Sequence, residues 1–243
     1  RFQNDDFGGA LGSLQGLYAP QFAGAFQPES WILTSTTYYF SCLYDESKSS
    51  LVEYERLYLP MSEKLKPLVD SVEPRELSAY FKIVNVTENP ELPKAVLNWV
   101  RTNERMLGLF GMLKEIETEK SMIEANQGWR AAKMSNELVT YLDQNKDTLE
   151  KTAGQIAKAR LTEAYRTIKG FGDQAEIIRF EIAKAEKEFA ETGLDGAALL
   201  GKQTLYRPKM PAENWNYWKF EGEFWRDEIG YYQYTLKRGC PTN

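Results

Sequence analysis

The apolar residues between Phe171 and Phe189 recur at alternating steps of four and three, which is the a and d pattern of a coiled-coil helix. We call this stripe the hairpin seam, and its members are Phe171, Ala175, Ile178, Ile182, Ala185 and Phe189. Charged residues such as Glu176, Lys184 and Glu186 lie between them and predict a solvated opposite face. Because a helix of this kind must pack its apolar stripe against another helix, the pattern predicts a protein of packed helices.

The preceding segment predicts the partner of the seam. From Trp129 to Lys169 the pattern is helical and free of proline, with apolar residues stepping by sevens at Leu142, Leu149 and Ile156. Gly170 and Gly172 follow and supply a turn. We therefore expect residues 129–192 to form a long antiparallel coiled-coil hairpin, since a helical pattern beyond about 25 residues favours a coiled coil.

Upstream of this hairpin the spacing indicates pairs of shorter helices. Two antiparallel helices are predicted over residues 29–43 and 46–58, with Pro60 ending the second or starting the next. One helix is expected over residues 94–123, and residues 75–84 are ambiguous between a helix and a strand. The sequence thus predicts an all-α fold in four parts: an irregular opening segment (1–27), a region of helical pairs (28–123), the long hairpin (124–200) and an aromatic C-terminal cap (201–243).

Residues with a recurring spacing follow in the first helical pair: Trp31, Tyr38, Tyr44, Ser47, Leu51 and Pro60. With this spacing, residues 31–60 resemble one tetratricopeptide repeat. The segment departs from the repeat at Thr34 and Ser35, where Leu and Gly are usual, at Tyr54, where the repeat has a small residue, and at Pro60, which comes one position late. With the long hairpin and the aromatic tail, the arrangement is similar to the C-terminal part of tetratricopeptide-type proteins of the bacterial envelope. The resemblance implies tetratricopeptide-like pairs over 28–123, an extracytoplasmic, periplasmic location and further repeats upstream of Arg1.

Composition narrows the function classes. The 243 residues carry 30 basic and 35 acidic side chains and no histidine. This mildly acidic balance argues against nucleic-acid binding. No run of about 18 apolar residues is present, so no membrane-spanning segment is expected. Without histidine the chain lacks the usual general base and the commonest zinc ligand, and it has no glycine-rich phosphate loop. We therefore expect a non-enzymatic protein without a cofactor or a metal.

The two cysteines, Cys42 and Cys240, allow two interpretations. They could form one disulfide, which would indicate an oxidising compartment. Alternatively they are unrelated reduced thiols, with Cys42 buried in a helix pair. The sequence alone leaves both interpretations open.

The C-terminal tail is rich in aromatic residues, and three roles compete for it. The aromatic residues singled out are Trp215, Trp218, Phe220, Phe224, Trp225 and Tyr231. The favoured role is a cap that covers the end of the helical stack, as terminal elements of solenoids do. The second is a docking surface for another protein, because aromatics often anchor interfaces. The third is a glycan site in which these rings combine with the acidic residues Glu221, Glu223, Asp227 and Glu228.

Together these features favour a non-enzymatic scaffold or adaptor subunit of a bacterial envelope assembly, whose partners are other protein subunits bound through helical surfaces. The alternative hypothesis is a module that binds or cleaves glycans such as peptidoglycan with the aromatic and acidic tail.

Overall fold

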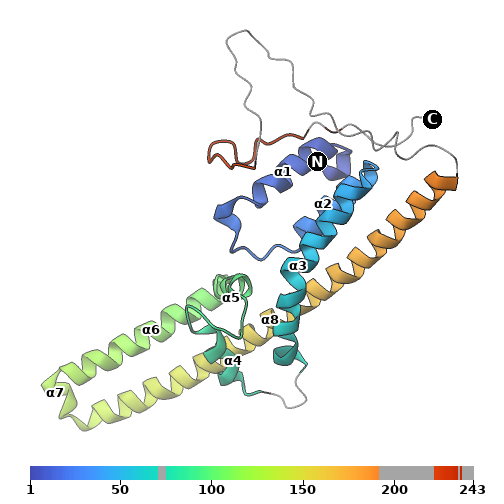
Figure 1. The fold of residues 1–243 in the computed structure, drawn as a ribbon. Coiled ribbons are helices and arrows are strands. Elements are labelled where there is room, and N and C mark those ends of the chain that lie inside the picture. Colours follow the sequence, from blue (N-terminus) through green and yellow to red (C-terminus); the bar gives the residue numbers. More distant parts are fainter. Residues whose placement is uncertain (71–74, 192–221, 235, 237–243) are drawn as a thin grey trace, which may run out of the picture. The chain divides into compact units, whose positions relative to one another are not determined.

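The computed structural model describes residues 1–70, 75–191, 222–234 and 236 (Figure 1). Every regular element in these residues is a helix and none is a strand, which confirms the predicted all-α class. The chain divides into two compact units. Unit 1 contains Arg1–Ala23, Gln27–Tyr58 and the described residues from Gly170 onward, whereas unit 2 contains Gly24–Phe26 and Leu59–Lys169.

Unit 1 begins with short helices in the segment that the sequence predicts to be irregular. These are the 3-10 helices η1 (Phe2–Asn4) and η2 (Pro20–Phe22) and the α-helix α1 (Phe7–Leu17). Asp6 starts α1, because its carboxylate accepts a hydrogen bond of 2.9 Å from the backbone N–H of Gly9. The opening segment thus contains a regular helix, α1, whose apolar residues Leu11 and Leu14 are buried.

The next helices of unit 1 form the pair that the sequence predicts. Helix α2 (Glu29–Phe40) is followed by α3 (Tyr44–Val69), of which Tyr44–Tyr58 belongs to unit 1. Small buried residues face each other between them: the Ser35 and Ser47 hydroxyls lie 2.8 Å apart, and Ser47 also donates to the Ser35 carbonyl at 2.8 Å. These contacts satisfy the two buried hydroxyls and hold the helices close together.

The predicted helix boundary at Pro60 is wrong, because α3 continues through both Pro60 and Pro67 to Val69. A proline inside a helix removes one hydrogen bond and crowds the preceding turn, which normally favours a break. Here both prolines lie on the exposed face. Leu65 and Leu68 on the opposite face are almost fully buried, and their packing compensates for the lost hydrogen bonds.

Unit 2 contains the end of α3 followed by α4 (Leu77–Val84), α5 (Lys94–Arg101), α6 (Glu104–Ala125) and α7 (Gln127–Arg130). The ambiguous residues 75–84 therefore form a helix. The single helix expected over 94–123 is instead two helices, because Asn103 caps α6. Its side chain accepts hydrogen bonds from the backbone N–H groups of Arg105 (3.1 Å) and Met106 (3.4 Å).

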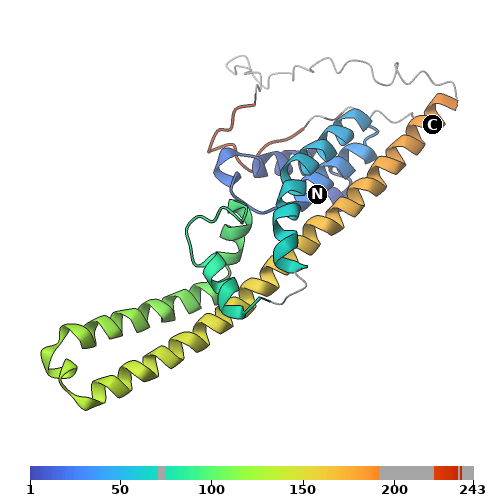
Figure 2. The same ribbon diagram turned by 60° about the horizontal axis from the view of Figure 1, so that its bottom comes forward.

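The last helix, α8 (Lys133–Glu191), corrects the predicted hairpin. It runs without a break through Gly170 and Gly172, so the turn expected there does not exist. Each glycine lowers helix stability by only about 1 kcal/mol relative to alanine, which does not end a helix whose flanks are strong helix formers. The antiparallel partner of the N-terminal half of α8 is α6, to which α7 connects it (Figures 1 and 2).

The predicted hairpin seam packs elsewhere as a result. In unit 1, the C-terminal part of α8 lies against α3, with ion pairs from Arg179 to Glu55 (2.8 Å) and from Lys48 to Glu186 (2.5 Å). Of the seam residues, Ala175 and Ile182 are buried, while Phe171, Ile178 and Ala185 are half-buried. The side chain of Phe189 lies outside the described residues.

Candidate interaction surfaces

The most prominent candidate surface belongs to the antiparallel pair in unit 2, which we call the arm: α6, α7 and residues 133–160 of α8. Its interior is an apolar seam of Leu109, Leu113, Ile116 and Leu142, all buried. The chain reverses at Asn126, whose side chain accepts hydrogen bonds from the backbone N–H groups of Gly128 and Trp129 and so starts α7. The arm is thus a two-helix coiled coil with a capped turn at its end.

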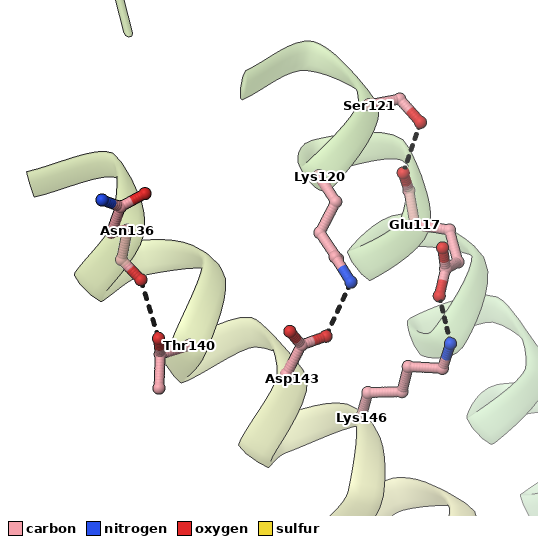
Figure 3. A network of polar contacts seen from close by, with 7 residues as sticks. All are labelled: Glu117, Lys120, Ser121, Asn136, Thr140, Asp143 and Lys146. Atoms are coloured by element: carbon pink, nitrogen blue, oxygen red, sulfur yellow. Dashed lines mark hydrogen bonds and ion pairs between the residues drawn. The ribbon is translucent and has the colours of Figure 1, made fainter. Parts of the chain in front are cut away.

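Two ion pairs set the register of the arm (Figure 3). Lys146 on α8 contacts Glu117 on α6 at 2.5 Å, and Lys120 on α6 contacts Asp143 on α8 at 2.6 Å. The side-chain hydrogen bond from Lys146 lowers the pKa of Glu117, and that to Asp143 raises the pKa of Lys120. In both pairs the two residue numbers add to the same sum, as is required in an antiparallel pair, where residue numbers rise along one helix and fall along the other. The two ion pairs therefore belong to one register.

The other side of the seam carries an open groove instead of ion pairs. Its larger section has a volume of about 670 Å³ and is lined by Arg105, Gly108, Leu109, Met112, Thr152, Gln155, Ile156 and Ala159. A smaller section of about 260 Å³ continues it toward α7 and is lined by Met112, Glu115, Ile116, Glu119, Asn145, Thr148 and Leu149. Met112 is shared by both sections, so they form one groove along the arm, which we call the arm groove.

The spacing of the α6 residues in this groove is that of a second coiled-coil stripe. They are Arg105, Gly108, Met112, Glu115 and Glu119, at steps of three, four, three and four. Because a helix turns by about 100° per residue, this stripe lies beside the buried seam and not on it. The alternating steps of this stripe are visible in the sequence, but because most of its residues are polar they did not indicate a helix-packing surface there.

The arm also exposes large apolar side chains outside the groove. At its end, around α7, the exposed fractions are 66% for Met122, 46% for Trp129 and 65% for Met134, and we call these three the tip residues. Leu107 and Tyr141 are exposed by 55% and 59% along its length. Scattered apolar residues are normal on protein surfaces, but aromatic and methionine side chains concentrated on one segment are typical of interaction sites.

In unit 1, the positions that match the tetratricopeptide spacing lie on both helices of the α2–α3 pair. Trp31 stacks on Tyr18, the C-cap of α1, with ring centroids 4.1 Å apart, while Ser47 and Leu51 are fully buried. Tyr38 and Tyr44 lie on α2 and α3, and Pro60 lies within α3 in the part assigned to unit 2. The structure therefore places most of these residues in the packing of unit 1.

The C-terminal segment packs its backbone on α1. A Cβ atom added to Gly12 would lie 1.8 Å from the Tyr232 carbonyl oxygen, and one added to Gly8 would lie 2.4 Å from the Tyr234 carbonyl oxygen. Tyr234 also donates its backbone N–H to the Gly8 carbonyl at 3.1 Å. Steps of four place these glycines on one face of α1, so only residues without a Cβ allow this approach.

The predicted aromatic residues of this tail have different environments. Phe224 is half-buried and packs edge-on against Tyr232 at 6.1 Å, whereas Trp225 and Tyr231 are exposed by 57% and 83%. Trp215, Trp218 and Phe220 lie outside the described residues, as does Glu221. Glu223 is half-buried, and Asp227 and Glu228 are exposed.

The strongest pKa shifts in unit 1 belong to buried tyrosines. Desolvation raises the pKa of Tyr18 to about 12 and raises that of Tyr54 further. Burial also raises the pKa of Tyr38, with a contribution from a hydrogen bond to Tyr234 of the tail. These shifts favour the neutral phenol and so reflect packing.

Cys42 is disulfide-bonded, and it lies in the α2–α3 turn with a left-handed φ of 55°. Cys240, the only other cysteine of the sequence, lies outside the described residues. The bonded state of Cys42 favours the first of the two interpretations of the cysteines.

No protein-family model matches this chain, and searches of curated proteins and of solved structures gave no match either. Among the helices of the described residues, none combines the length and the apolar character that a membrane span needs.

Proposed function

We propose that this protein is a non-enzymatic, tetratricopeptide-like scaffold subunit of a bacterial envelope assembly, and that it binds other protein subunits through the arm. One observation carries the proposal: the arm has a complete buried seam, yet it leaves the tip residues and Met112, which is 51% exposed, open to solvent. Side chains of this size and type anchor protein interfaces when a partner buries them.

The pKa shifts support a scaffold role. Among the described residues they belong to tyrosines shifted by burial and to members of surface ion pairs such as Glu117 and Lys120. Both kinds of shift have structural causes. The envelope location is supported by the disulfide at Cys42, because disulfides persist in oxidising compartments.

The experiment compares partner recovery by the full-length protein and two triple variants purified from the native envelope fraction. The first replaces the tip residues: Met122→Ser, Trp129→Ser and Met134→Ser. The matched control replaces three equally exposed apolar residues of unit 1: Val52→Ser, Ile177→Ser and Phe180→Ser. Because truncating an interface anchor costs 2 kcal/mol or more, we expect the tip variant to lose at least about tenfold of the co-purified subunits. Equal recovery by both variants, at unchanged circular dichroism, would contradict the proposal.

A second candidate function, glycan binding, is favoured by the exposure of Trp225 and Tyr231 next to Asp227 and Glu228. Exposed rings beside carboxylates suit the stacking and hydrogen bonding of sugars. Soluble peptidoglycan fragments would then raise the melting temperature, because they bind only the folded protein, and Trp225→Ala would abolish the rise. An unchanged melting temperature would leave the scaffold proposal as the better one.

A further inference from the structure

We propose that the arm groove binds the arm groove of a second copy of this protein, so that two arms pack antiparallel around a two-fold axis passing next to Met112. This inference rests on the proposed scaffold function and identifies one of its partners as the protein itself. The product would be a four-helix bundle made of two α6–α8 pairs.

The groove residues have the spacing of a helix-packing stripe. The α6 stripe from Arg105 to Glu119 has the three–four steps that a helix uses to interlock with another helix. On α8 the groove residues Asn145, Thr148, Thr152, Gln155 and Ala159 repeat the same steps. Each helix of the arm therefore has two interlocking stripes, one used in the buried seam and one open. The two open stripes can each pack against another helix, and a second arm supplies two helices held in the same register relative to each other.

The groove carries opposite charges toward its two ends. Arg105 and Glu119 lie seven residues before and after Met112, which is about 10.5 Å along the helix in either direction. An antiparallel two-fold arrangement centred on Met112 places Arg105 of each copy opposite Glu119 of the other, because two-fold contacts are reciprocal. Within the described part of the chain neither residue forms an ion pair, whereas the other flank of the seam pairs Glu117 and Lys120 with α8. The groove is thus complementary to itself in the antiparallel direction.

The shape of the groove also suits a second arm. On α8, Leu149 and Ile156 lie three residues before and four residues after Thr152, so the same axis brings them to nearly the same level in the two copies. On α6, Gly108 leaves open space, since nothing lies within 4 Å of a Cβ added there. The facing arm can fill this space with the stem of Glu115, which lies within one residue, about 1.5 Å, of the level that the axis pairs with Gly108.

The test is a charge exchange, measured by sedimentation velocity with the full-length chain over a range of concentrations. The wild type is expected to dimerise. Arg105→Glu and Glu119→Arg should each weaken the dimer at least about tenfold, because each creates two like-charge contacts in place of two attractive ones. An equimolar mixture of the two variants should restore the dimer, since every contact then joins opposite charges. The double variant should restore it as well.

Two controls keep this test independent of folding. Lys114→Glu reverses a charge on the exposed outer face of α6 and should leave the dimer unchanged. Gly108→Gln fills the groove, whereas Gly111→Gln places the same side chain in open space outside it, so only the first should give a monomer. Circular dichroism should show both variants to be as helical as the wild type.

A wild type that stays monomeric at every concentration, or single variants that remain unpaired when mixed, would overturn the inference. The outcome is separable from that of the proposed function. A monomer that still recovers other subunits through the tip residues refutes the dimer alone. A dimer that recovers none refutes the proposed function alone.

Discussion

Replacing Gly154 by alanine tests the packing of α8 in unit 2. The Cβ of an alanine at this position would lie 1.8 Å from the Leu77 carbonyl oxygen at the start of α4. Ordinary contact begins at 3.4 Å, so the two backbones would have to separate by 1.6 Å, the difference of these distances. No side-chain rotation can relieve the clash, because Leu77 presents its main chain.

The magnitude follows from two opposing effects. Alanine favours the helix by about 1 kcal/mol over glycine. Overpacking of a close contact costs about 1–3 kcal/mol, and a clash with backbone lies at the upper end of that range. We therefore expect Gly154→Ala to lower the free energy of unfolding by about 1–2 kcal/mol, which for a chain of this size lowers the melting temperature by roughly 2–8 °C.

The assay is thermal unfolding followed by circular dichroism, with Gly170→Ala and Gly172→Ala as matched controls in the same helix. Nothing lies within 4 Å of a Cβ at either control position, so each should raise stability by up to about 1 kcal/mol. If Gly154→Ala raised the melting temperature as much as the controls, the close approach of α4 and α8 would be refuted.

Three further predictions concern unit 1. Gly12→Ala should release the C-terminal segment from α1 and speed its cleavage in limited proteolysis, whereas Gly16→Ala, with its nearest neighbour at 3.5 Å, should leave the cleavage rate unchanged. Ile182→Asp places an unpaired charge in a site that is 1% exposed, so it should lower the free energy of unfolding in urea by at least about 3 kcal/mol. Glu186→Ala removes only an exposed ion pair and should lower it by less than about 1 kcal/mol. Equal losses from the two variants would contradict the orientation of α8. Burial raises the pKa values of Tyr18, Tyr38 and Tyr54, so these tyrosines contribute stability below pH 10. This stability should be lost as the pH rises from 10 through about 12, by up to about 1.4 kcal/mol per pH unit for each tyrosine. Phenolate absorbance that rises at pH 10 without loss of helicity would contradict their burial.

The sequence was a good guide wherever local spacing and final packing agree. The α2–α3 pair was predicted because its apolar and small residues, among them Ser47 and Leu51, are also the residues that the fold buries. The periodicity of residues 171–189 likewise predicted a helix with a buried stripe. What the stripe packs against could not be predicted, because a coiled-coil pattern specifies a partner helix without saying which one.

The errors arose where a residue type was treated as a boundary. Gly170, Gly172 and Pro60 disfavour a helix locally, but the helices continue through them because apolar residues on either side keep the same buried face. The opposite error concerned residues 94–123, where α5 ends at Arg101 and the Asn103 side chain caps the start of a new helix, α6, although the apolar pattern is continuous. The contact between the glycines of α1 and the C-terminal segment could not be predicted from the sequence, because the contacting atoms belong to backbone more than two hundred positions away.

The division of the chain has a consequence for the order of folding. Unit 2 draws almost entirely on one continuous stretch, Leu59–Lys169, so its contacts can form as soon as that stretch has left the ribosome. Unit 1 joins residues before Tyr58 to residues after Gly170, and α1 cannot acquire its backbone contacts until Tyr232 and Tyr234 have been made. Contacts so distant in sequence carry a larger loop-closure entropy and form slowly. During synthesis, α1, α2 and the start of α3 can therefore pack on one another early, but the surfaces that α8 beyond Gly170 and the C-terminal segment cover stay open while the inserted unit folds.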